Sequence, residues 1–333
     1  MIRAPRRPLL ALLGVLGALV IHGGAFAAGD DSGARMLERG RAAATKNDFD
    51  GTVRVSWKDG NEVRSRVVHV SVRDGVVRAG RTVVGSGRRR LLRTSTGWRL
   101  LWSDPARGRA PDPDAKYDLV VLDGEQVARR PTRLVVVRDG DIVRERLSFD
   151  AATGVLLRRD ELDPAGHVTR RMTFERISAP VPARGSTVAS LPQSGPANAP
   201  LWVDQVPDGL NGPQSVGDGF QRAGVYQQSN GDVQIYYADG VFGLSVFEHK
   251  GSLAWDELPA GGHDTQLGDR RARAYEFATG RALVWESDGV VYTLVSDAPP
   301  SEVAKVARDF GSQDHDDTLD QIGDFVTAPF SWD

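Results

Sequence analysis

The sequence predicts an α+β protein in which antiparallel sheets dominate and a few helices pack against them. Val53, Val55 and Trp57 alternate with polar residues, and the same period of two recurs along most of the chain. Short turns rich in Gly, Asp and Pro join consecutive strands, so neighbouring strands pair antiparallel. A proline-rich stretch at residues 179–200 cannot form a core and reads as a linker. We therefore expect two domains.

Residues 1–27 have the features of an export signal. Three arginines precede an apolar run at residues 9–21, and Ala25, Phe26 and Ala27 form a small-residue cleavage site. An uncleaved membrane anchor is the alternative, although the run is shorter than the roughly 20 residues that a bilayer requires. We predict a periplasmic or otherwise extracytoplasmic protein.

The first domain is predicted over residues 28–178. An alanine-rich segment at 34–46 has the apolar spacing of an amphipathic helix, and about eight strands follow it. The last three strands form a meander with one apolar face and one arginine face. We expect the arginine face to be a solvated outer surface with cross-strand ion pairs, and a site for anionic groups is the alternative. Its members are Arg144, Arg146, Arg158, Arg159, Arg170 and Arg171.

A smaller α+β domain is predicted over residues 201–310. Asp239 and Gly240 supply a turn between two strands, and residues 302–310 have the apolar stripe of a closing helix. The tail at residues 311–333 contains acidic residues and no lysine or arginine. Blocks of like charge are usually solvated, and a binding role for this tail is the alternative.

The composition restricts the chemistry. The chain of 333 residues has no cysteine and a net charge of -2, which excludes a thiol nucleophile and argues against a nucleic-acid partner. The sequence contains no nucleophile elbow, zinc-protease motif or phosphate loop. We therefore predict no catalytic residue, no metal site, no cofactor and no enzymatic activity. A secreted hydrolase is the alternative from another class.

Several segments resemble the RseB/MucB family, whose members are periplasmic regulators of the sigma-E envelope-stress pathway. The segments are NDFDGTV at 47–53, LDGEQVARRP at 122–131 and FDAATGVLLR at 149–158. In the second domain, YADGVFGLSVFE at 237–248 is similar to the family's YSDGLxxxSVFxE strand pair. The resemblance covers nearly the whole mature chain, with the segments in the family's order.

The resemblance implies a LolA-like N-terminal domain, a curved antiparallel half-barrel sheet with a helix in its concave face. It implies that the C-terminal domain engages a membrane-spanning anti-sigma factor, and that lipid or lipoprotein ligands displace this partner. The alternative among binding proteins is a lipid or lipoprotein carrier of the cell envelope, for which the first domain alone suffices. The oligomeric state stays open, a homo-oligomer included.

Two sets of aromatic and apolar residues are candidates for binding. Trp57, Trp98 and Trp102 are predicted to line an apolar groove for lipid, with ordinary core packing as the alternative. For the anti-sigma partner, the candidates are partner-facing or supporting residues of the second domain. They are Tyr237, Phe242, Val246 and Phe247.

Overall fold

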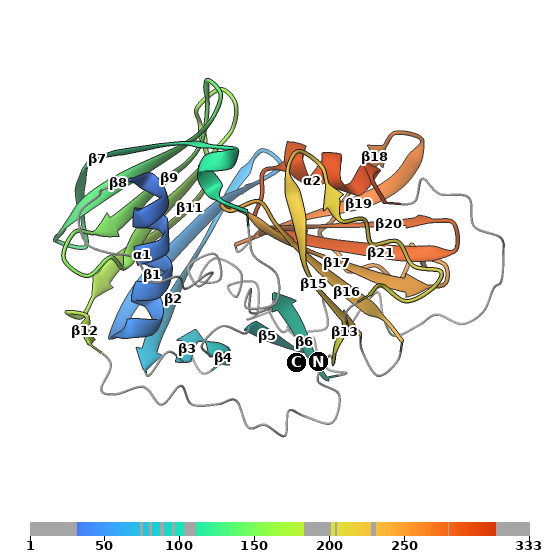
Figure 1. Ribbon diagram of the computed structural model, residues 1–333, viewed down its shortest axis with the longest axis horizontal. Coiled ribbons are helices and arrows are strands. Elements are labelled where there is room, and N and C mark those ends of the chain that lie inside the picture. Colours follow the sequence, from blue (N-terminus) through green and yellow to red (C-terminus); the bar gives the residue numbers. More distant parts are fainter. Residues whose placement is uncertain are drawn as a thin grey trace, which may run out of the picture.

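The computed structural model describes most of the chain between residues 32 and 310. The described ranges are 32–73, 76–79, 82–86, 90–94, 97–102, 111–182, 201–203, 205–227, 231–278 and 280–310. Two large antiparallel sheets lie side by side, blue to green and gold to red in Figure 1. Within the described ranges no helix is long and apolar enough to cross a membrane. The predicted export signal and acidic tail lie outside these ranges.

The first sheet has ten strands in the order β4-β3-β2-β1-β11-β10-β9-β8-β7, with β12 beside β1. Its strands are β1 (Asn47–Asp59), β2 (Glu62–Arg73), β3 (Val76–Ala79), β4 (Thr82–Ser86), β7 (Asp118–Val127), β8 (Arg130–Asp139), β9 (Ile142–Asp150), β10 (Leu156–Leu162), β11 (Val168–Ile177) and β12 (Val181–Pro182). The sheet is open and curved (Figure 1). A separate hairpin consists of β5 (Arg90–Thr94) and β6 (Gly97–Trp102), and the 3-10 turn η1 (Pro113–Ala115) precedes β7.

The helix α1 (Gly33–Lys46) packs against the first sheet through the buried side chains of Met36, Leu37 and Ala43. A Cβ atom at Gly40 would lie 2.2 Å from the ring of Phe149, so the missing side chain allows helix and sheet to approach closely. This contact explains a glycine inside a helix, where it is intrinsically unfavourable. The predicted α+β class, with a helix against a curved antiparallel sheet, is confirmed.

The second sheet has nine strands in the order β13-β15-β16-β17-β21-β20-β19-β18, with β14 beside β15. Its strands are β13 (Leu201–Val203), β14 (Ser215–Val216), β15 (Phe220–Gln227), β16 (Val233–Ala238), β17 (Gly243–Lys250), β18 (His263–Leu267), β19 (Arg270–Phe277), β20 (Gly280–Ser287) and β21 (Val290–Ser296). The helix α2 (Pro300–Arg308) buries Val303, Val306 and Ala307 in the main core. A smaller apolar cluster contains Leu253 and Leu258.

The arginines of β9, β10 and β11 do not share one face, which corrects the sequence prediction. Arg159 lies directly opposite Leu147 and Met172, so it belongs to the apolar face, whereas Arg171 lies opposite Asp160. Successive residues of a strand point to opposite faces, so two adjacent arginines must divide between them. Arg144, Arg159 and Arg170 are buried, and the expected solvated surface is wrong for these three.

Candidate functional site at the junction of the two sheets

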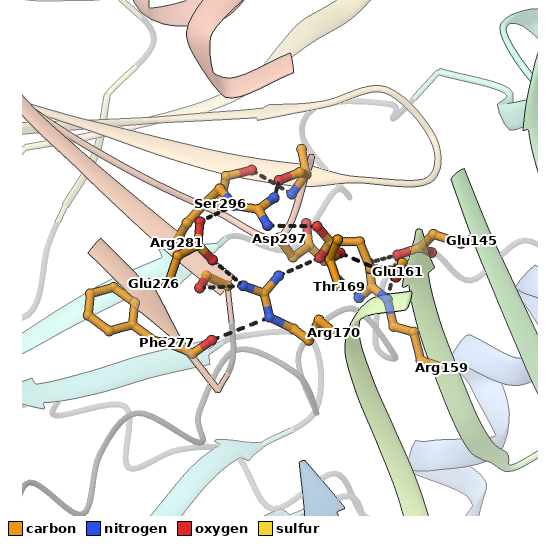
Figure 2. A network of polar contacts seen from close by, with 12 residues as sticks. Glu145, Arg159, Glu161, Thr169, Arg170, Glu276, Phe277, Arg281, Ser296 and Asp297 are labelled. Atoms are coloured by element: carbon orange, nitrogen blue, oxygen red, sulfur yellow. Dashed lines mark hydrogen bonds and ion pairs between the residues drawn. The ribbon is translucent and has the colours of Figure 1, made fainter. Parts of the chain in front are cut away.

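The first and second sheets are joined by a ring of four charges, of which Glu161, Arg170 and Arg281 are buried and the fourth, Glu276, is partly buried (Figure 2). Arg170 on β11 forms ion pairs with Glu161 on β10 and with Glu276 on β19, the latter at 2.7 Å. Arg281 on β20 contacts the same two carboxylates, at 2.6 Å for Glu161 and 3.0 Å for Glu276. We call these residues the four-residue ring. Each cation bridges two anions, so the ring is neutral and joins both sheets.

The guanidinium groups of the ring also donate to main-chain carbonyl groups of the second sheet. Arg170 Nη2 donates to Gly280 O at 2.9 Å and its Nε to Phe277 O at 3.3 Å, and Arg281 Nη1 donates to Ala298 O. Removing one member of a buried ion pair leaves an uncompensated charge, which costs about 3–5 kcal/mol. The ring therefore fixes the relative position of the sheets.

Burial and the two arginines act in opposite directions on Glu161. Burial raises the pKa of this carboxyl, but the charges of Arg281 and Arg170 outweigh it and hold the pKa below the usual value. Glu161 is thus an anion at neutral pH. Its charge is part of the ring rather than a group available for proton transfer.

A second group of charged side chains lies beside the ring. It has one guanidinium group and two carboxyl groups. Arg159 Nε donates to Glu145 Oε1 at 2.7 Å, and its Nη1 donates to Asp297 Oδ2 at 2.9 Å. The other oxygen of Asp297 accepts from the main-chain N–H of Gly243 at 3.0 Å. We call Glu145, Arg159 and Asp297 the triad. Burial raises the pKa of Glu145 to about 8 against the attraction of Arg159.

The turn at Asp239 forms a further contact between the two parts of the chain. Asp239 Oδ1 accepts from the N–H groups of Val241 and Phe242, at 3.0 and 2.7 Å, which fixes the turn. Its Oδ2 accepts from Lys116 Nζ at 3.0 Å and from the Tyr117 hydroxyl. Asp239 and the segment before β7 thus hold each other in place.

Gly240 completes this contact because only glycine suits its position. Its φ of 93° is unfavourable for residues with a side chain, and a Cβ atom would lie 2.7 Å from both Pro111 O and Pro113 N. Arg41 of α1 donates to Gly240 O. The segment 237–248, which resembles a family motif, therefore reaches the first sheet and α1 through its turn.

A small cavity lies between α1, the first sheet and this turn. Apolar side chains such as Leu37, Leu147 and Phe149 line it, together with the polar groups of Arg41, Glu145 and Arg159. Its volume is about 30 Å³, which is room for a few water molecules at most. An acyl chain is far larger. A lipid would enter this space only after α1 or the turn had moved.

The candidate lipid residues are only partly placed by the structure. Trp57 is half-buried near the end of β1, opposite Arg170, and packs against the main core. Its indole N–H is buried and has no hydrogen-bond partner among the described residues. Trp98 and Trp102 belong to β6, but their side chains lie outside the described part of the chain. The tryptophan groove stays a prediction.

The candidate partner residues are buried and form part of the second sheet's core. Their exposed fractions do not exceed 2%. The Tyr237 ring lies edge-on to Phe310, and its hydroxyl donates to Pro213 O at 3.0 Å. Phe242 lies edge-on to Tyr117 with ring centroids 6.0 Å apart, so it contacts the segment before β7. Val246 and Phe247 are also interior, and the binding role of all four stays a prediction.

The sequence reasoning missed the charged residues of the junction. A signal was present in β9, where Glu145 precedes Leu147 and Phe149 at a spacing of two. A carboxylate at such an inward position requires a buried partner. The partners beyond the first sheet could not be named from the sequence. Each lies more than 100 residues along the chain from the charge that it contacts on β10 or β11.

Comparisons with known proteins give matches among solved structures alone. No family model and no curated protein matches the chain. A crystal structure of MucB in complex with MucA(peri) is 19% identical, over 83% of this chain and 97% of that chain, with a TM-score of 0.45. A Pseudomonas aeruginosa MucA/MucB complex structure is 19% identical, over 83% and 96%, with a TM-score of 0.42.

A more distant match is a putative outer membrane lipoprotein-sorting protein domain from Vibrio parahaemolyticus. It is 10% identical over 79% of this chain and 89% of that chain, with a TM-score of 0.20. The RseB/MucB family, which the sequence resembles, is thus found among the solved structures. Likeness at these identities concerns the fold alone.

Proposed function

We propose that the chain is a non-enzymatic, extracytoplasmic negative regulator of a sigma-E-type envelope stress response. In this role it binds the extracytoplasmic segment of a membrane-spanning anti-sigma factor. The observation that carries the proposal is the position of segment 237–248. This segment resembles a family motif, and its turn contacts the segment that precedes β7. Asp239 and Gly240 of this segment contact Lys116 and Pro111 ahead of β7. A regulator with two interdependent parts requires such a contact.

We propose that the two parts correspond to domains at residues 28–178 and 201–310, with a linker at 179–200. The signal at residues 1–27 directs export, and the tail at 311–333 follows the second domain. The described sheets support two parts because each has its own path of paired strands, and β12 at the start of the proposed linker pairs with β1 of the first sheet.

The size of the cavity beneath α1 bears on how a lipid could enter at this place. A carrier needs apolar space that is ready for an acyl chain, whereas the cavity beneath α1 has a volume of about 30 Å³. Entry of a lipid or lipoprotein chain would therefore require opening of the junction. The closed and the lipid-bound forms would then exclude each other.

Such exclusion gives a physical basis for release of the partner. A ligand shifts an equilibrium only by its difference in affinity for the two states. If the anti-sigma segment binds the closed form and lipid binds the open form, each weakens the other's binding by the same factor. On opening, the apolar side chains of Leu37 and Phe149 would contact the acyl chain, while Arg41 and Arg159 suit an anionic headgroup.

The test is capture of membrane proteins from detergent-solubilised membranes with the mature protein as bait, read by mass spectrometry. We expect a single-span membrane protein with a cytoplasmic sigma-binding domain. The variant Gly240→Ala, which places a Cβ against Pro111, should capture much less of it. Gly268→Ala is the matched control, since Gly268 also has a positive φ, of 68°, but open space around it.

Two results would contradict the proposal. Equal capture by Gly240→Ala and the mature protein would show that the turn contact has no part in partner binding. Recovery of lipids or lipoproteins without a membrane-spanning protein would favour the carrier instead.

A further inference from the structure

The four-residue ring and the triad differ in their charge balance. The four-residue ring has two guanidinium groups and two carboxylates. The triad has one guanidinium group, on Arg159, and two carboxyl groups, on Glu145 and Asp297. Its side chains are enclosed, with exposed fractions of 8% for Arg159, 1% for Glu145 and 15% for Asp297. A second ionised carboxylate would thus be an uncompensated charge in a nearly dry site, which is strongly unfavourable.

We propose that the two sheets close together with a proton bound to the triad, so that the junction is a proton-linked contact that weakens as the pH rises. The proposal concerns the junction itself and stands whichever partner the chain binds.

The geometry places this proton on Glu145. Both oxygens of Asp297 are occupied by donors, namely Arg159 Nη1 and the N–H of Gly243. Only one oxygen of Glu145, Oε1, accepts from Arg159. Glu145 also lines the small cavity, which is large enough for a water molecule that would accept the bond from a protonated Oε2.

The charged groups around Glu145 come from three parts of the chain. Arg159 and Glu161 lie on β10, and Asp297 follows β21. Arg41 of α1 lines the same cavity and donates to Gly240 O. The carboxylates of Asp297 and Glu161 oppose ionisation of Glu145, and Arg159 favours it. Arg159 cannot neutralise both of its acidic partners, so the triad would carry a net negative charge unless one carboxyl group binds a proton.

The direction of the pH effect follows from the two states of Glu145. In the closed junction burial raises its pKa to about 8, and in the open junction water returns it toward its ordinary value of 4.5. The closed form therefore holds one more proton between these two values. The equilibrium constant for opening should rise by up to about tenfold for each pH unit in this window and level off above it.

The first experiment measures the proton directly. Carboxyl-labelled glutamate is introduced into the mature protein, and the carboxyl signals are followed by carbon NMR during a pH titration. Glu145→Gln identifies the signal of Glu145. We expect its midpoint near pH 8, and a midpoint in the ordinary range of glutamate would overturn the proposal.

Two variants test whether the proton depends on the closed triad. Asp297→Asn removes the competing negative charge while keeping an oxygen for Gly243, so the midpoint of Glu145 should fall. Gly240→Ala forces the turn away from Pro111 and should lower the midpoint as well. If that variant does not fold, Tyr117→Phe replaces it, because it removes the hydroxyl bond to Asp239. If the midpoint of Glu145 is unchanged in these variants, its protonation does not depend on the closed junction.

The second experiment measures opening between the sheets. The chain has no cysteine, so two introduced at the exposed residues Gln126 and Gln266 carry spin labels, one on β7 and one on β18. We expect the open population to increase with pH in the parent and to lose this dependence in Glu145→Gln. Glu248→Gln is the matched control, because Glu248 is a buried acid of the second sheet whose pKa is also raised to about 8. Equal pH dependence in the parent and in Glu145→Gln would refute the link.

Discussion

Replacement of Arg281 by methionine should destabilise the protein more than any surface charge change. Arg281→Met keeps much of the side chain's length but removes the contacts to Glu161 at 2.6 Å and to Glu276 at 3.0 Å. Arg170 is then the single cation between two carboxylates. Loss of one partner from a buried ion pair costs about 3–5 kcal/mol, so the free energy of unfolding should fall by roughly that amount near neutral pH.

The loss should be smaller in acid. Arg281 is the largest of the charges that lower the pKa of Glu161, so the variant allows this carboxyl to take up a proton more readily. A protonated Glu161 no longer needs a second cation. The difference in unfolding free energy between parent and variant should thus decrease as the pH falls through the range in which Glu161 of the variant titrates.

The assay is urea unfolding followed by circular dichroism, at neutral and acidic pH. Arg273→Met is the matched control, since Arg273 lies on the neighbouring strand β19 and pairs with the exposed carboxylate of Asp264 at 2.8 Å. Surface ion pairs contribute little, so this variant should resemble the parent. If Arg281→Met were no less stable than Arg273→Met at neutral pH, the four-residue ring would not hold the sheets together.

Three further predictions concern single residues. Burial raises the pKa of Glu248 to about 8, so its ionisation lowers the unfolding free energy by about 1.4 kcal/mol for each pH unit between 4.5 and 8. Glu248→Gln should remove this contribution, as measured by urea titrations at several pH values. Gly40→Ala should lower the melting temperature despite alanine's better helix propensity, because a Cβ would lie 2.2 Å from the Phe149 ring. Trp57→Phe should retain stability, since it removes a buried N–H without a partner among the described residues. Trp57→Ala should lower stability by calorimetry, by less than the cost of about 3–5 kcal/mol for a fully buried aromatic residue, because Trp57 is half-buried.

Each of these predictions has a result that would contradict it. An unchanged pH slope in Glu248→Gln would mean that this carboxyl is already ionised in the folded state. A higher melting temperature for Gly40→Ala would show that α1 can shift away from the first sheet. If Trp57→Ala lost lipid binding but kept full stability, Trp57 would be a groove residue rather than a core residue.

Strand patterns predicted the fold because they are local. Val53, Val55 and Trp57 alternate in the sequence as they do in β1, and the turn at Asp239 and Gly240 was also predicted. The contact of that turn with Lys116 and Pro111 could not be predicted, since it joins segments that are more than 100 residues apart. Local patterns identify a turn but do not say what packs against it.

The prediction of a single arginine face failed for a related reason. The period of two correctly divides Arg158 from Arg159 and Arg170 from Arg171, but the sequence analysis grouped all four on one surface. Applied consistently, the alternation places Arg159 and Arg170 beside apolar residues of the first sheet. Each of the two arginines has one anionic partner on the first sheet and a second beyond it, Asp297 for Arg159 and Glu276 for Arg170. No pattern within β10 or β11 shows that a second sheet covers this face.

A junction of charges has a different energetic consequence from an apolar one. Separating two apolar surfaces exposes them to water at a cost of about 25 cal/mol for each Å². Separating the sheets instead breaks the two ion pairs that cross the junction, Arg170 with Glu276 and Arg281 with Glu161, and hydration of the exposed charges offsets much of the lost attraction. The ring thus specifies how the sheets fit together, while apolar contacts such as that of Phe242 with Tyr117 also favour the closed state. A proton on Glu145 then adjusts this balance, because it is bound in the closed state and released in the open one.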